Sequence, residues 1–273
     1  MVEVLVHFVA PALVGVLIGI ASGLLGIGGG TVMVPIFRLA FGMSATMSTA
    51  TSLFAIIPTS ISGAISHVKG KTCIPALGIA AGLGGACLSP VGVWLAQLSP
   101  DWLVMLAAAL IIGYSAINMF KKAFKLRPAG QPAEGADAAA STADDSSLSR
   151  KQLLQGAAIG LVAGLASGYV GVGGGFIMVP LMLSIIGIPM RKASGTSLIA
   201  VMILAIPGVI EQGIIGNINY LAGIAIVIGT IPGAVIGARL VTKVPERTLR
   251  LLFGCFLIVA AVMLVLNEVG IFG

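Results

Sequence analysis

Two glycine-rich turns contain the residues of this sequence that are best suited to binding a ligand. They consist of Gly28, Gly29 and Gly30 and, later in the chain, of Gly173, Gly174 and Gly175. Each turn precedes an apolar segment that we expect to be a helix, and the first N–H groups of a helix have no partner within it. Glycine leaves these groups uncovered, and a helix N-terminus carries a partial positive charge. The turns therefore predict a site for a small anion.

Hydroxyl side chains follow each turn and begin the next long apolar segment. At a helix start, hydroxyl groups commonly cap the helix. Alternatively, they donate hydrogen bonds to the oxyanion that the glycine amides bind, and the sequence leaves both roles open. Ser22 and Ser167 precede the turns, and we expect them to bond back to their own helices. The candidate ligands after the turns are Thr51, Ser52, Thr196 and Ser197.

The two turns belong to a repeat that covers most of the chain. The sequence from Ser22 to Pro35 recurs from Ser167 to Pro180, a displacement of 145 residues. We therefore interpret the chain as two copies of one unit, with a glycine-broken segment in each copy. In lipid, such irregular backbone must be buried in protein or line a cavity, and a duplicated break indicates the binding site of a transporter.

Other glycines recur at spacings of three and four residues before each turn. Small residues at this spacing allow the backbones of membrane helices to pack closely. We assign this packing role to Gly15, Gly19, Gly23 and Gly26 and to Gly160, Gly164, Gly168 and Gly171.

The composition predicts an all-α polytopic membrane protein. Hydrophobic residues make up 58% of the chain and charged residues only 9%, whereas a soluble domain carries about 25% charged residues. Apolar runs such as 9–25, 103–119 and 251–266 approach the roughly 20 residues that cross a bilayer. The net charge of +6 comes from basic residues at segment ends. Because these residues set orientation, we do not expect nucleic-acid binding.

We expect each copy to contain five apolar segments. The copies are a first transmembrane repeat at 1–125 and a second at 151–273, joined by a flexible cytoplasmic linker at 126–150 that is too polar for the bilayer. The segments run over 5–26, 29–42, 45–68, 73–98 and 101–124, and over 153–171, 174–188, 193–215, 218–242 and 246–268.

An odd number of segments inserts the second copy upside down, which makes the repeats inverted. With both termini outside, fourteen of the fifteen Lys and Arg residues lie on the cytoplasmic side and only Arg38 lies outside, as the positive-inside rule requires. The segments 29–42 and 174–188 span only about 21 Å of a core of about 30 Å. Each either crosses at a tilt or pairs with its predecessor as a re-entrant hairpin, and the sequence does not separate these two arrangements.

Few titratable residues lie within the apolar segments. His67 is either a polar residue at the membrane face or a proton carrier, and Glu211 is the sole carboxylate of its segment. A Glu211 that lies deep in the membrane would indicate proton coupling. The sequence contains no Ser-His-acid set, no paired carboxylates and no His/Cys cluster, so we expect no enzyme activity, no metal site and no cofactor.

The glycine motif resembles that of the TauE/SafE family of sulfite and organosulfonate exporters. The resemblance lies in Gly-x-x-Gly-x-Gly-Gly-Gly-x-x-x-Val-Pro at 23–35 and 168–180, followed in each copy by Ala/Gly-Thr-Ser-Leu. It implies export of sulfite, sulfoacetate and related anions across the bacterial inner membrane, driven by ion gradients. The residues alone indicate only a small anion as substrate.

Together these patterns predict a secondary transporter that works by alternating access. Its partners would be a small anionic substrate, the lipid bilayer and a coupling ion such as the proton. An uptake permease or a passive channel for another small anion is the alternative function. The sequence does not determine the sulfur anion, the transport direction, the coupling ion or whether the protein forms a homo-oligomer.

Overall fold

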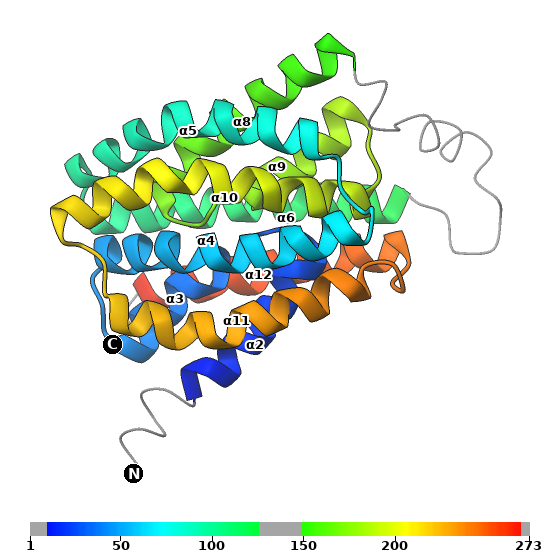
Figure 1. Ribbon diagram of the computed structural model, residues 1–273. Helices are drawn as coiled ribbons and strands as arrows, with labels where there is room; N and C mark the ends of the chain where they lie inside the picture. The colour runs from blue at the N-terminus through cyan, green and yellow to red at the C-terminus, as the bar shows by residue number, and fades with distance from the viewer. Residues whose placement is uncertain (1–9, 126–148, 269–273) are drawn as a thin grey trace.

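The regular structure of the described residues is entirely helical. A computed structural model of the protein describes residues 10–125 and 149–268 (Figure 1). The predicted segments are confirmed to within a few residues, except that the start of the first segment lies outside the described residues. The helices are α2 (Ala10–Leu25), α3 (Gly30–Phe41), α4 (Ala45–Lys69), α5 (Pro75–Leu98), α6 (Asp101–Lys125), α8 (Arg150–Val170), α9 (Gly175–Leu181), the π-helical turn η3 (Met182–Ile186), α10 (Met190–Ile215), α11 (Tyr220–Leu240) and α12 (Glu246–Glu268).

Polar side chains start several of the long helices by accepting their first N–H groups. Ser44 accepts from the amide of Met47 at the start of α4, and Asn219 accepts from Ala222 at the start of α11. Ser149 and Gln152 form a capping box at the start of α8. Such caps satisfy N–H groups that the helix itself leaves unpaired. Most of the predicted linker, 126–148, lies outside the described residues.

Carboxylates also join helix starts that are distant in sequence. Asp101 at the start of α6 accepts a hydrogen bond from Ala45 N at the start of α4, with an N···O distance of 3.2 Å. Glu246 at the start of α12 does the same for Met190 N at the start of α10, also at 3.2 Å. The corresponding helices of the two halves are thus held together in the same way.

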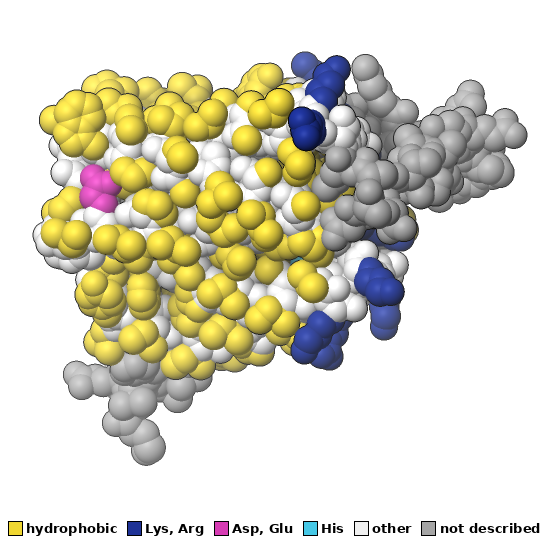
Figure 2. Space-filling view, turned by 45° about the horizontal axis from the view of Figure 1, so that its top comes forward, with side chains coloured by type: hydrophobic (Ala, Val, Ile, Leu, Met, Phe, Trp, Pro, Cys, Tyr) yellow, Lys and Arg dark blue, Asp and Glu magenta, His cyan; other side chains and the backbone are white. Residues whose placement is uncertain are grey.

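Seven helices of the described residues are long and apolar enough to cross a membrane. They are α4, α5, α6, α8, α10, α11 and α12, whereas α2, α3 and the α9–η3 segment are shorter. Hydrophobic side chains cover the face shown in Figure 2, and Lys and Arg side chains gather at one end of the bundle. This distribution is that of a multi-pass membrane protein.

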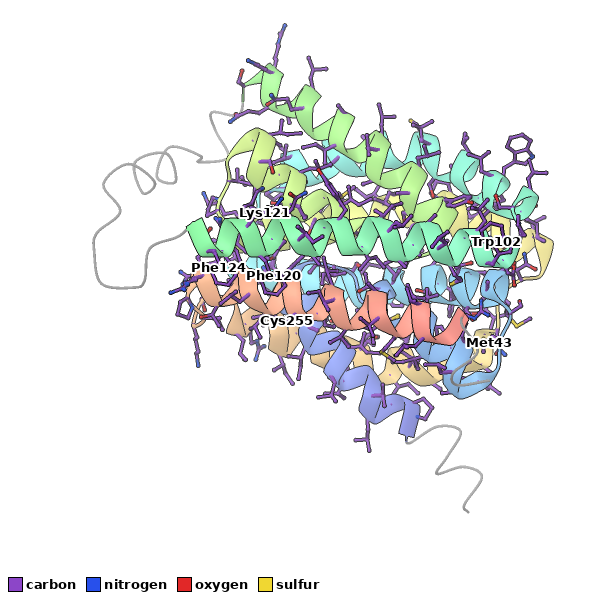
Figure 3. The ribbon with its side chains drawn as sticks, turned by 180° about the vertical axis from the view of Figure 1, so that it is seen from behind. Met43, Trp102, Phe120, Lys121, Phe124 and Cys255 are labelled. Atoms are coloured by element: carbon purple, nitrogen blue, oxygen red, sulfur yellow. The ribbon has the colours of Figure 1, made fainter. Side chains whose placement is uncertain are left out.

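Two of the shorter segments, α3 and α9–η3, each form a hairpin with the helix that precedes them. In Figure 1, α2 begins and α3 ends at the end of the bundle where α4 begins. Trp102 and Met43 lie at this end, whereas Lys121 lies at the other end of α6 (Figure 3). Helix α8 and the α9–η3 segment form a similar hairpin that opens toward the opposite end (Figure 1). Segments 29–42 and 174–188 therefore fold back along the helices that precede them.

The two halves contact each other through the first and fourth helical segments of each half. Helix α2 packs along α11, and α8 packs along α5. At these contacts a Cβ on Gly160 would overlap the carbonyl oxygen of Ala81, and one on Gly23 would overlap that of Ala234. The predicted packing role of these glycines is confirmed, because only glycine allows the backbones to lie so close. The inverted orientation of the two copies remains a prediction.

Replacing Gly160 by valine should destabilise the protein, because the side chain would push α8 away from α5. Overpacking of this kind costs about 1–3 kcal/mol. Thermal unfolding in detergent would measure the loss. Gly113→Val on α6 is the matched control, since a Cβ there meets nothing within 4 Å. Equal unfolding temperatures for the two variants would contradict the close packing of α8 on α5.

Candidate functional site

The two predicted glycine turns meet inside the helix bundle. Gly29 begins α3 with a φ of 86°, and Gly174 begins α9 with a φ of 66°, a left-handed conformation that favours glycine. A Cβ on Gly30 would lie 2.5 Å from the carbonyl oxygen of Val172. A Cβ on Gly175 would lie 2.5 Å from the carbonyl oxygen of Gly26. The turns are therefore in direct backbone contact, and both are buried.

Most amides of these turns lack a hydrogen-bond acceptor. Among the described residues, no hydrogen bond uses the N–H of Gly28, Gly29 or Gly30, or that of Gly173 or Gly174. Gly175 differs, since its N–H donates to the carbonyl oxygen of Gly173 at 2.8 Å. Buried N–H groups in native proteins nearly always have partners, including water or ligand. These five amides can therefore donate to water or to a ligand.

Two of the predicted hydroxyl ligands connect the halves of the protein. Thr51 Oγ1 accepts a hydrogen bond from the backbone of Asn219 at 3.0 Å, and Thr196 Oγ1 accepts one from Ile74 at 2.9 Å. Each bond ties a central helix, α4 or α10, to the start of α11 or α5. A hydroxyl that accepts in this way keeps its own hydrogen. Thr51 and Thr196 can therefore still donate to another group.

The two predicted serine ligands differ in their contacts. Ser197 Oγ lies 2.7 Å from the carbonyl oxygen of Gly26 and 2.9 Å from that of Ser194. Its single hydrogen is thus directed to backbone, and it holds the first glycine segment against α10. Ser52 Oγ is buried and has no hydrogen-bond partner. Of the pair, Ser52 alone keeps both its donor and its acceptor capacity.

Two further serines lie beside the turn that precedes α3. A Cβ on Gly28 would lie 3.4 Å from Ser60 Oγ, and one on Gly29 would lie 3.7 Å from Ser22 Cβ. Both hydroxyls are fully buried and have no partner. The expected back-bonding of Ser22 and Ser167 is therefore wrong, since neither hydroxyl reaches a carbonyl oxygen. Ser60 was not predicted. It lies eight residues after Ser52, a spacing of about two helical turns that places both residues on similar sides of α4.

His67 lies at the end of α4 and is fully buried. Its Nε2 lies 2.8 Å from the carbonyl oxygen of Gly23, and its Nδ1 lies 2.7 Å from Thr72 Oγ1. Because a carbonyl oxygen only accepts, Nε2 carries a hydrogen. The equivalent Gln212 is paired instead with Asn217 at 2.8 Å. His67 thus connects α4 to the helix that enters the first glycine turn.

Glu211 lies near the end of α10 and is partly exposed. Its Oε2 is a buried atom without a hydrogen-bond partner. Glu211 is not among the residues that lie closest to the glycine turns. The closest side chains to these turns are apolar or carry hydroxyl groups, among them Ile56, Val201 and Ser60. An anion at the turns would therefore be bound by neutral donors.

A cavity of about 790 Å³ lies between α5, α6, α8 and the α9–η3 segment. Its lining is mainly apolar, with Tyr114, Ser115 and Asn118 among the polar exceptions. None of the predicted ligand residues lines it, and no charged side chain does. We therefore do not assign the anion site to this cavity. Within the described residues, no group of three or more His, Cys, Asp or Glu side chains could hold a metal ion.

Comparison with known proteins identifies the family of this helical bundle. Residues 11–264 match the family described as sulfite exporter TauE/SafE. The chain belongs to this family. Probable membrane transporter protein YunE of Bacillus subtilis is 28% identical over 275 residues, which cover 97% of this chain and 99% of YunE. A probable membrane transporter protein of Haemophilus influenzae is 29% identical, over 93% of this chain and 97% of its own length.

Membership in the TauE/SafE family makes this protein a membrane transporter and not an enzyme. YdhB of Bacillus subtilis, also named as a probable membrane transporter protein, is 28% identical over 87% of this chain and 92% of its own length. No solved structure matches the chain. The glycine turns and hydroxyls described above lie within the matched residues.

Thr196→Val should destabilise this TauE/SafE protein, because valine cannot accept the hydrogen bond from Ile74 N. Leaving a buried N–H unpaired costs about 1–3 kcal/mol. Thr242→Val is the matched control, since Thr242 is exposed and bonds only to Arg239 within its own turn. Thermal unfolding would compare the two variants. An unchanged unfolding temperature for Thr196→Val would show that its hydroxyl has no structural role.

Proposed function

We propose that this protein is a secondary transporter that exports small sulfur-containing anions across the inner membrane. Sulfite, sulfoacetate and other organosulfonates are the proposed substrates. The observation that carries this proposal is the contact of two buried glycine turns with unpaired amides. Membership in the TauE/SafE sulfite exporter family supports the choice of sulfur anions.

Neutral donors are well suited to a transported anion. A lysine or arginine placed within the membrane would cost at least about 2.5–3.5 kcal/mol. Backbone amides and hydroxyls avoid this cost and leave no permanent charge when the site is empty. Sulfite and sulfonate groups present several oxygens, each of which accepts hydrogen bonds from such donors. The proposed donors are the amides of Gly28, Gly29, Gly30, Gly173 and Gly174, with hydroxyls from Thr51, Ser52 and Thr196.

Alternating access is the proposed mechanism, with two inverted repeats moving relative to one another. Equivalent contacts in the two halves support it: α2 packs on α11 as α8 packs on α5, and α6 packs on α12. The gathering of Lys and Arg at one end supports a cytoplasmic location for that end (Figure 2). Both chain termini would then lie outside.

Proton coupling through His67 or Glu211 is the proposed link to an ion gradient. Buried histidine and intramembrane carboxylate groups are common in proton relays. The hydrogen bond between His67 Nδ1 and Thr72 Oγ1 supports this role for His67, because the hydroxyl can either donate to Nδ1 or accept from it. The imidazole can therefore gain or lose a proton without losing that hydrogen bond.

Gly29→Ala should reduce sulfite efflux from proteoliposomes by about tenfold or more, because the turn could not keep its left-handed geometry and amide positions. Hydrogen bonds to a charged group are worth about 1.5–3 kcal/mol each. Gly187→Ala is the matched control, since Gly187 also has a positive φ, of 78°, but a Cβ there meets nothing within 4 Å. Wild-type efflux by Gly29→Ala would contradict the site at the turns.

Counterflow should distinguish the proposed transporter from a passive channel. Unlabelled sulfite inside proteoliposomes should accelerate entry of labelled sulfite. The reason is that a transporter with sulfite bound returns its site to the outer side faster than an empty one. A channel would show flux without this trans-stimulation. Efflux and uptake measured under imposed proton gradients of either sign would then test export against uptake as the coupled direction.

A further inference from the structure

The two glycine turns differ in the polar side chains that surround them. Beside the turn before α3 lie Ser60, near Gly28, and Ser22, near Gly29. Thr31 follows in the first turn of α3 itself. The hydroxyl groups of all three residues are fully buried and have no hydrogen-bond partner.

The turn before α9 lacks most of these hydroxyls. The positions displaced by 145 residues from Ser60 and Thr31 are Ala205 and Phe176. Only Ser167 keeps a hydroxyl, at the position equivalent to Ser22. A Cβ on Gly174 would meet the carbonyl oxygen of Ala163 at 2.9 Å, so this turn is closely covered by α8.

An apolar side chain, Ile56, lies against both turns. The Cγ2 atom of Ile56 would lie 3.3 Å from a Cβ on Gly28, and its Cδ1 atom would lie 2.8 Å from a Cβ on Gly173. Val201 Cγ1 would lie 3.0 Å from the Cβ position of Gly28. An oxyanion at Gly28 would therefore have both a hydroxyl group and apolar carbon as neighbours.

Unpartnered buried hydroxyls are uncommon, because each loses its hydrogen bonds to water without compensation. Here they lie beside amides that also lack partners, so one bound oxyanion would satisfy both groups. We infer that the oxyanion binds on one side only, at the turn before α3, through the hydroxyls of Ser60 and Ser22 and the amides of Gly28 and Gly29. This assignment rests on the proposed transport of small anions and names the half of the protein that recognises them.

The one-sided site has a consequence for specificity. The hydroxyls and amides bind the oxygens of the substrate, whereas Ile56 and Val201 contact what is attached to sulfur. The site thus accepts a pyramidal sulfite or an R–SO3 group whose R is apolar next to sulfur. On this inference the turn before α9 packs against the site, and the amides of Gly173 and Gly174, included above among the proposed donors, do not bind the anion.

Serine-to-alanine variants in proteoliposomes test the assignment through KM and Vmax for sulfite. Ser60→Ala and Ser22→Ala should each raise KM by about tenfold, because each removes a hydrogen bond to a charged group. Ser167→Ala is the matched control and should leave KM within about twofold. The unfolding temperatures of Ser60→Ala and Ser22→Ala should stay equal or rise, since alanine removes an unsatisfied hydroxyl. A merely structural serine would instead lower the unfolding temperature.

The outcomes separate this inference from the proposed function. An equal rise in KM for Ser167→Ala would overturn the one-sided site, although the transport of anions at the turns would stand. Unchanged KM in all three serine variants, with efflux lost in Gly29→Ala, would likewise overturn only the role of the hydroxyls. Unchanged sulfite transport in the serine variants and in Gly29→Ala would overturn both.

Discussion

The fold depends on enclosing irregular backbone within an apolar molecule. Peptide groups that leave the helical ladder at the two turns find no water in lipid, so protein must surround them. The hairpins α2–α3 and α8–α9 place these groups in the centre of the bundle, where each turn contacts the other. Only glycine permits both the positive φ and the backbone contact. The long helices surround the turns and exclude lipid and bulk water from them.

Both halves of the chain build the enclosure. Ser197 on α10 reaches the carbonyl oxygen of Gly26, and Thr59 on α4 contacts Thr230 on α11 at 2.6 Å. Helices α5 and α11 lie close against α8 and α2 because glycines line both contacts. Few large side chains lie at these two contacts, because the backbones themselves meet there. A transporter that rocks its halves would need this kind of contact around a site that stays intact.

The site combines features that sequence reasoning found with features that it missed. The turns and their position before α3 and α9 follow from local glycine chemistry, and they were predicted, whereas the positive φ angles of their glycines come from the structure. The contacts of individual hydroxyls were not. Ser22 was expected to bond within its helix, and Ser60 was not predicted, because its segment contains many hydroxyl side chains and no local pattern distinguishes this one. The partner of Ser197 is Gly26, which lies 171 residues away in the chain, so no local pattern could reveal it.

The sequence alone determined the helical segments, the broken positions between them and the membrane as the surrounding solvent, since these depend on hydrophobicity and on local backbone freedom. It also carried the family motif, because that motif is contiguous. Only the tertiary structure decided that the short segments fold back as hairpins and which buried hydroxyls remain without partners. Both depend on distances between residues far apart in the chain, and those distances are set by how whole helices pack.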